Sequence, residues 1–188
     1  MNKYRTHNCN ELRKDKVGEK VILSGWINKK RDHGNLLFID LRDNYGITQC
    51  IIDKDNKDFS KLEKIQLETV IKVEGKVVTR SHETINKEIA TGEIEIAIEN
   101  CETLGLCKEL PLPVFSDQEY SEEIRLKYRF LDLRRKKIHE NIILRSKVIS
   151  FIREQMNKLG FLEFQTPILT SSSPEGARDF LVPSRLNP

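Results

Sequence analysis

The sequence is poor in features that would tie the protein to a membrane or to export. Hydrophobic residues make up 38% of the 188, and no apolar run approaches the roughly 20 residues of a membrane-spanning helix. The N-terminal stretch MNKYRTHNCNELRKDK has no apolar segment, so we do not expect a secretory signal there. We therefore expect a cytoplasmic protein with no membrane association.

Metal-ligand and catalytic motifs are absent too. The 4 cysteines stand at positions 9, 50, 101 and 107, and they form no C-x-x-C pair and have no pair of histidines beside them. We expect free thiols of a reducing compartment and no metal site. There is no Walker loop, GxGxxG, HExxH or Ser-His-Asp pattern. We therefore expect no self-sufficient catalytic site, and no catalytic residue, in this chain.

Charge is abundant and unevenly placed, although the net charge is only +3. Residues 1–35 hold 9 Lys/Arg against 4 Asp/Glu, residues 93–123 hold 9 Asp/Glu against 1 Lys, and residues 125–153 hold 10 Lys/Arg against 2 acids. Basic zones attract phosphate. Charge alone is equally well explained by solvated faces without a ligand.

Alternation of apolar and polar residues predicts five strands in the first half of the chain. They cover residues 21–27, 36–41, 47–52, 69–79 and 93–98. Between the third and the fourth, Phe59, Leu62 and Ile65 recur every three residues, which predicts a short helix. Five strands with a helix in this place are the arrangement of an OB-fold barrel, which binds oligonucleotides on one face.

The second half has a different organisation. Residues 108–120 contain two prolines and no period, which predicts a linker. Ser121 followed by two glutamates predicts a helix start, and a longer helix is predicted over 137–159, with Gly160 ending it. Residues 161–170 (FLEFQTPILT) predict a strand containing Pro167. We expect domains at 1–107 and 121–188, joined by 108–120, in a mixed α+β chain.

Strand parity singles out residues for nucleic-acid binding. Leu37, Ile39 and Leu41 share one side, which places Phe38 on the other side, next to a basic turn expected at 28–35. An exposed aromatic beside Lys and Arg suits base stacking with phosphate attraction, but Phe38 packed under a loop explains the pattern equally well. Parity also predicts outward Arg80 and Glu95, which suit either base edges or a surface ion pair. Gln49 has no clear parity, because its strand is apolar on both sides.

Three stretches resemble one family. Residues 25–52 (GWINKKRDHGNLLFIDLRDNYGITQCII) resemble the anticodon-binding barrel of class II tRNA synthetases of the aspartate, asparagine and lysine group. Residues 122–137 (EEIRLKYRFLDLRRKK) resemble the hinge of the same group. Residues 160–185, with the preceding helix, resemble motif 1 and its dimer interface. The loop SPEGARDFLVPSR and KEIATGEIEI (87–96) are similar to the bacterial aspartate type.

The resemblance implies a role for each matching position. It implies that Phe38 stacks on an anticodon base and that Arg31, Gln49, Arg80 and Glu95 contact the anticodon. Glu175 would lie in an active-site lid loop and bind the α-ammonium group of L-aspartate. His33, in the basic turn, resembles the type that charges tRNA(Asn) as well as tRNA(Asp).

The resemblance also implies ATP and Mg²⁺ as cofactors of the full-length homodimeric enzyme, whose motifs 2 and 3 would lie beyond residue 188. We therefore expect this piece to bind no cofactor and to form no aspartyl-adenylate alone. A lysine or asparagine synthetase is an alternative, against which the SPEGARDFLVPSR loop argues. A stand-alone OB-fold RNA-binding protein without catalysis is another, against which residues 121–188 argue.

Overall fold

The computed structural model describes residues 2–115, 118–169, 180 and 182–186. The chain divides into two units, residues 1–135 and 136–188. The expected boundaries at 107 and 121 remain a proposal. The loop SPEGARDFLVPSR lies largely outside the described residues.

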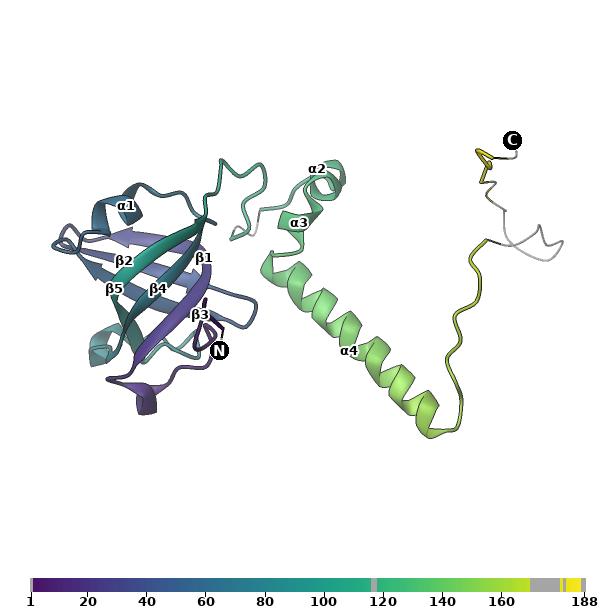
Figure 1. Ribbon diagram of the computed structural model, residues 1–188, viewed down its shortest axis with the longest axis horizontal. Helices are drawn as coiled ribbons and strands as arrows, with labels where there is room; N and C mark the ends of the chain where they lie inside the picture. The colour runs from purple at the N-terminus through teal and green to yellow at the C-terminus, as the bar shows by residue number, and fades with distance from the viewer. Residues whose placement is uncertain (1, 116–117, 170–179, 181, 187–188) are drawn as a thin grey trace. The chain divides into compact units, whose positions relative to one another are not determined.

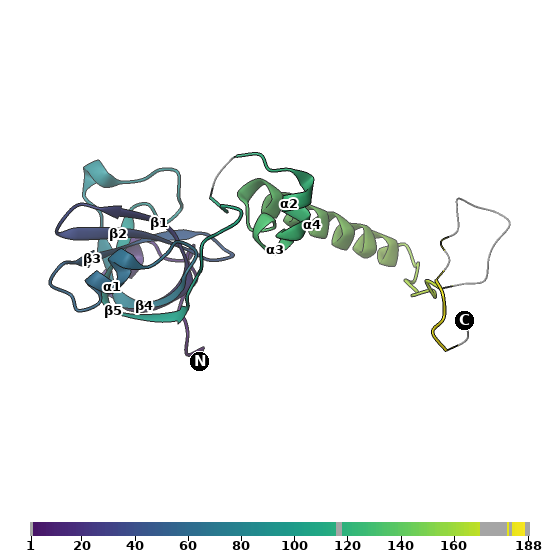
Figure 2. The same cartoon turned by 90° about the horizontal axis from the view of Figure 1, so that it is seen from above.

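The first unit contains a closed barrel of five strands (Figure 1). Its strands are β1 (Lys20–Asp32), β2 (Leu36–Arg42), β3 (Ile47–Asp53), β4 (Val70–Thr79) and β5 (Ile94–Gly105), in the order β1-β2-β3-β5-β4. The β3–β5 pair is parallel and the other pairs are antiparallel. Helix α1 (Phe59–Lys64) lies between β3 and β4 in sequence, and Figure 2 shows it beside the barrel. The predicted OB-fold is confirmed.

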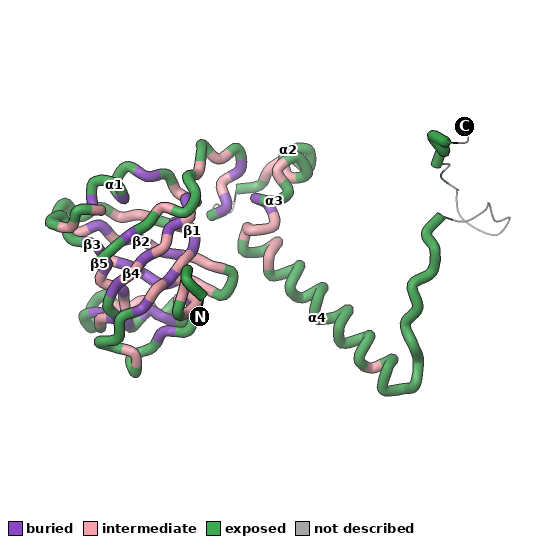
Figure 3. The backbone as a smooth tube through the Cα atoms, in the orientation of Figure 1, coloured by how far each residue is buried: buried purple, intermediate pink, exposed green. Residues whose placement is uncertain are grey.

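The barrel interior is filled by the apolar side chains that alternation places inward. Ile71, Val73 and Val77 of β4 are 0% exposed, and the inward residues of β2 and β5 are buried as predicted (Figure 3). Close strand contacts require glycine at two points. A Cβ on Gly75 would lie 2.2 Å from the carbonyl oxygen of Ala97, and one on Gly25 would lie 2.3 Å from that of Arg42. No other residue fits there without moving the neighbouring backbone.

Two strands are longer than alternation predicts. The basic turn expected at 28–35 belongs largely to β1, which pairs with β2 as far as Asp32 opposite Leu37. A register shift between Ile27 and Lys29 leaves Asn28 as an extra residue, so the alternation breaks although the pairing continues. β5 runs on to Gly105 for a similar reason, with a shift where Glu74 and Gly75 of β4 face it.

The predicted linker contributes a small core of its own. Leu112 and Val114 are buried against Leu131 of α3 (Arg129–Asp132). The predicted helix start at Ser121 is confirmed by α2 (Glu122–Lys127). Asp132 has a fully buried side chain with three arginines around it: Arg125 at 3.1 Å, Arg129 at 2.7 Å and Arg135 at 3.6 Å.

A second cluster, here called the Trp26 clamp, consists of Trp26, Arg42, Glu68 and Arg134. The guanidinium carbons of Arg42 and Arg134 lie 5.8 and 4.7 Å from the indole centroid. Glu68, whose side chain is 1% exposed, accepts two hydrogen bonds from Arg42, at 2.6 and 2.8 Å, and lies 3.7 Å from Arg134. The clamp thus ties the 121–135 segment to the barrel.

The second unit contains helix α4 (Lys136–Lys158), as the periodicity predicts. Gly160, at φ +88°, ends it. The amide of Phe161 donates to the carbonyl of Met156, and that of Gly160 to the carbonyl of Asn157, which is a Schellman motif. Most apolar residues of α4 are exposed in the described structure (Figure 3).

The strand predicted over 161–170 is wrong for residues 161–169, which have no regular secondary structure. A strand needs a neighbour for its hydrogen bonds. Among the described residues no strand pairs with this segment.

Candidate nucleic-acid interface

The outer face of the barrel brings together most of the residues that sequence analysis singled out. Arg31 of β1 is opposite Phe38 of β2, and Asp40 of β2 is opposite Gln49 of β3. Glu95 of β5 lies beside Gln49, because Cys50 is opposite Ile96 in the parallel β3–β5 pair. Residues from four strands therefore share one surface.

Five side chains form a continuous line of hydrogen bonds and one ion pair, here called the polar row: Arg31, Asp40, Gln49, Glu95 and Arg80. Arg31 Nη2 donates to Asp40 Oδ1 and to Gln49 Oε1, both at 2.8 Å. Gln49 Nε2 donates to Glu95 Oε2 at 2.6 Å. Arg80 Nε lies 3.8 Å from the same oxygen of Glu95. The polar row therefore holds two guanidinium groups, two carboxylates and one amide.

Gln49, whose parity the sequence left open, takes part in the outer polar row and is only 6% exposed. Its two charged neighbours determine how the amide is turned. The oxygen faces a guanidinium donor and the nitrogen faces a carboxylate acceptor. The reverse orientation would put donor against donor and acceptor against acceptor.

Arg80 differs from the prediction, because its side chain is buried rather than outward. Its Nε donates to the carbonyl of Ile94 at 3.2 Å and its Nη1 to the carbonyl of Thr84 at 3.1 Å. Burial lowers the pKa of the Arg80 guanidinium, and Glu95 and Asp40 partly offset that effect. Strand parity could not predict this, since the loop that follows β4 folds back over the side chain.

Phe38 is half-buried on the same face, and His33 lies against it. The ring centroids are 5.2 Å apart and the ring planes are 81° to each other. His33 is exposed in the short turn between β1 and β2. The residue proposed for tRNA discrimination therefore touches the residue proposed for base stacking.

The two lysines of the predicted basic turn lie in different environments. Lys29 is exposed, whereas Lys30 donates to the carbonyls of Leu62, Glu63 and Ile65 at 3.2, 2.7 and 2.6 Å. These carbonyls lie at the C-terminal end of α1, where a cation is favourable. Lys30 therefore secures α1 to the barrel, and burial lowers the pKa of its ammonium group.

Asp40 is the residue of this face that sequence analysis missed. Its parity with Phe38 in LLFIDL would have placed it there. Glu175, predicted to bind aspartate, lies outside the described residues.

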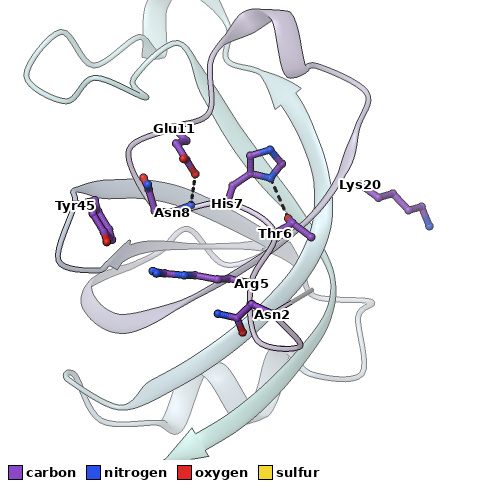
Figure 4. A pocket seen from close by; sticks show the side chains of 8 residues that line it. All are labelled: Asn2, Arg5, Thr6, His7, Asn8, Glu11, Lys20 and Tyr45. Atoms are coloured by element: carbon purple, nitrogen blue, oxygen red, sulfur yellow. Dashed lines mark hydrogen bonds between the residues drawn. The ribbon is translucent and has the colours of Figure 1, made fainter.

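A separate hollow of about 760 Å³ lies over the N-terminal segment (Figure 4). Its charged residues have partners: Arg5 lies 3.7 Å from Asp43, and Lys20 lies 2.8 Å from Glu99. It contains none of the predicted site residues. Among the described residues no group of three or more His, Cys, Asp or Glu could hold a metal ion, and no helix there is long and apolar enough to cross a membrane.

Two family models match the chain. Residues 21–104 match the OB-fold nucleic acid binding domain, and residues 121–188 match the class II tRNA synthetases for D, K and N. The two matches lie in the order and at the positions that the resemblance implies. The barrel is thus similar to an OB-fold nucleic acid binding domain, and the region after it is similar to class II tRNA synthetases for aspartate, lysine and asparagine.

Relatives that match over the whole chain are named aspartate–tRNA(Asp/Asn) ligases. It is 80% identical over all 188 residues to the aspartate–tRNA(Asp/Asn) ligase of Pelagibacter ubique and 60% identical to that of Dinoroseobacter shibae. It covers 32% of each of these proteins, so it spans about a third of the length of the curated relatives it matches.

Solved structures agree on the fold. The asparaginyl-tRNA synthetase of Pyrococcus horikoshii, complexed with asparaginyl-adenylate, matches with a TM-score of 0.79 and 29% identity, over 90% of this chain and 38% of that one. The aspartyl-tRNA synthetase of Entamoeba histolytica matches with a TM-score of 0.72 and 22% identity, over 86% and 39% of the two chains. The second likeness concerns the fold alone.

Proposed function

We propose that this chain is the anticodon-binding region and the beginning of the catalytic domain of an aspartate–tRNA ligase. The whole protein would activate L-aspartate with ATP and transfer it to tRNA(Asp). The relatives that match over the full chain are named for this reaction. We further propose that it works in the cytoplasm.

The observation that carries the proposal is the polar row beside Phe38 on the outer face of the barrel. An aromatic ring offers stacking to an unpaired base, and neighbouring amide, carboxylate and guanidinium groups offer hydrogen bonds to base edges. Arg31, Gln49 and Glu95 keep further donor or acceptor capacity beyond the bonds described above. We therefore propose that the anticodon loop of the tRNA is bound by five residues: Arg31, Phe38, Gln49, Arg80 and Glu95.

Arg80 would act differently from the other four. Because it is buried and bound to two backbone carbonyls, its role would be to hold Glu95 in place. A direct contact between Arg80 and RNA would require the loop after β4 to move.

The same proposal covers the second unit. Exposed apolar side chains on α4, among them Ile149, Ile152 and Met156, would be covered by a second copy of the chain in a homodimer. Glu175 would bind the aspartate substrate. ATP and Mg²⁺ would be the cofactors of the whole protein.

His33 is the candidate for tRNA choice. Its contact with Phe38 puts it next to the proposed stacked base. We propose that the whole enzyme charges tRNA(Asn) as well as tRNA(Asp). Aminoacylation of purified tRNA(Asn) with aspartate tests this, and failure to charge it would remove the assignment.

The anticodon proposal is tested with the 188-residue chain and a short RNA hairpin that carries the aspartate anticodon loop. Phe38→Ala should weaken binding by about 1–3 kcal/mol, because the stacking surface is lost. Fluorescence anisotropy with labelled hairpin measures the affinity. Phe130→Ala, at an exposed phenylalanine of α3, is the matched control and should bind as the unaltered chain does.

Equal affinity of Phe38→Ala and the unaltered chain would contradict the assignment of this face. Aspartate-dependent ATP–pyrophosphate exchange by the whole protein tests the ligase activity itself. Exchange by residues 1–188 alone would contradict the view that the remaining catalytic groups lie elsewhere.

A further inference from the structure

The polar row contains carboxylates on a surface that is proposed to meet a polyanion. Asp40 and Glu95 have side chains that are 18% and 15% exposed. A carboxylate repels phosphate, and phosphate contacts supply most of the sequence-independent affinity for nucleic acid. Carboxylates on this face therefore cannot contribute to phosphate affinity, and the contacts that they make indicate another role.

The geometry around Asp40 shows what its carboxylate does. Arg31 Nη2 lies 2.8 Å from both Asp40 Oδ1 and Gln49 Oε1, so one nitrogen serves both acceptors. Arg31 is the more exposed of the two charged partners, since its side chain is 40% exposed against 18% for Asp40. Asp40 also lies directly opposite Gln49 in the β2–β3 register. The carboxylate therefore holds the guanidinium where it can orient the amide.

The consequence extends along the row. With Arg31 in place, Gln49 presents its oxygen on one side and its nitrogen toward Glu95. If Arg31 turned away to a phosphate, the Gln49 oxygen would lose its donor, and only the hydrogen bond from Nε2 to Glu95 would hold the amide. An amide held on one side only can tilt away from its position, and a displaced amide discriminates less well between bases.

We propose that Asp40 is a positioning residue for base recognition. It keeps Arg31 bound within the polar row, so that Arg31 and Glu95 hold the Gln49 amide from both sides. The face thereby has a lower affinity for phosphate and a greater discrimination between bases. This inference rests on the proposed anticodon function, and it assigns to Asp40 a role without direct contact to the RNA.

The test uses the 188-residue chain with Asp40→Asn and two hairpins, one with the aspartate anticodon loop and one with its middle base changed. Both affinities are measured at several salt concentrations. At low salt, Asp40→Asn should bind the changed hairpin about two- to threefold more tightly than the unaltered chain does, because one repelling charge is gone. The ratio of the two affinities should fall about tenfold, because the amide is then held on one side only.

Two further variants separate geometry from charge. Asp40→Glu keeps the charge but moves the carboxylate by one methylene, so discrimination should fall while affinity for the changed hairpin stays constant. Asp15→Asn removes an exposed carboxylate in the short turn η1 (Lys14–Lys16), outside the row, and should leave discrimination intact. If Asp40→Asn fails to fold, Asp40→Glu alone decides the question.

The outcomes are distinguishable from failure of the proposed function. If the unaltered chain does not distinguish the two hairpins, anticodon recognition itself is wrong. If it does, and both Asp40 variants distinguish them equally well, the positioning role is overturned. An equal loss of affinity for both hairpins would also overturn it, because that is the result of a purely structural role.

Discussion

Replacing Glu68 by alanine should destabilise the barrel by about 3 kcal/mol. Glu68 is nearly inaccessible, and both of its oxygens accept hydrogen bonds from Arg42. Breaking a buried pair by removing one partner costs about 3–5 kcal/mol, because the other charge is left uncompensated. We expect the lower end of this range, because Arg42 keeps its 2.7 Å hydrogen bond to Asn28 and is 16% exposed.

A second substitution at the same position separates the side chain from the backbone. Glu68 has φ +62°, in the left-handed region that costs a non-glycine residue about 1 kcal/mol or more. Glu68→Gly relieves this strain, whereas Glu68→Ala does not. The glycine variant should therefore be about 1 kcal/mol more stable than the alanine variant, although both lose the same carboxylate.

The assay is equilibrium urea unfolding followed by tryptophan fluorescence. Trp26 is the single tryptophan of the chain, and it lies in the clamp itself, so the signal reports on the affected region. With a typical urea dependence of about 1–3 kcal/mol per M, the alanine variant should unfold at about 1–3 M less urea. Glu99→Ala, which breaks the exposed pair with Lys20, serves as the control and should change the midpoint little.

A midpoint for Glu68→Ala that matches the control would refute the view that the clamp stabilises the barrel. A glycine variant less stable than the alanine variant would instead refute the backbone part of the reasoning.

Two other predictions concern charged residues outside the clamp. Lys30→Met should lower thermal stability, because three carbonyls at the end of α1 lose their donor. Lys29→Met should leave thermal stability unchanged, but it should reduce the salt dependence of RNA binding by roughly one counterion. Burial raises the pKa of the Asp132 carboxyl, but hydrogen bonds and charges from its three arginines outweigh this and hold it below its usual value. Asp132→Asn should therefore be less stable than the unaltered chain at neutral pH. The difference measured by urea unfolding should shrink as the pH falls below about 4, because a carboxylate with a lowered pKa stabilises the folded chain only while it is ionised. A difference that is constant with pH would contradict this account of Asp132.

The barrel could be predicted from the sequence because each of its strands has one buried and one outer face. Apolar residues therefore recur at every second position along a strand, as at Ile71, Val73 and Val77. A register shift interrupts the alternation without ending the strand. The sequence therefore indicated a basic turn where β1 in fact continues. The strand expected over 161–170 shows the opposite error, since apolar composition there stands without a pairing partner among the described residues.

The candidate site was predictable as a set of residue types on one face but not as a network. Parity placed Phe38 and Glu95, and it would have placed Asp40, yet it could not assign Gln49 to a side or show that a loop covers Arg80. Those facts depend on which strands are neighbours, and the parallel β3–β5 contact that brings Gln49 to Glu95 joins segments more than 40 residues apart.

The network changes how this face is expected to recognise RNA. A row of independent polar side chains would each choose a partner when a base arrives, and the free energy of ordering them would count against binding. In the polar row the side chains are already ordered before RNA binds, because each charged group holds its neighbour in place. Since the carboxylates balance the guanidinium groups, the row adds little net attraction for phosphate. On the proposed function, the polar row would serve to distinguish bases, while stacking on Phe38 and exposed cations such as Lys29 would supply the affinity.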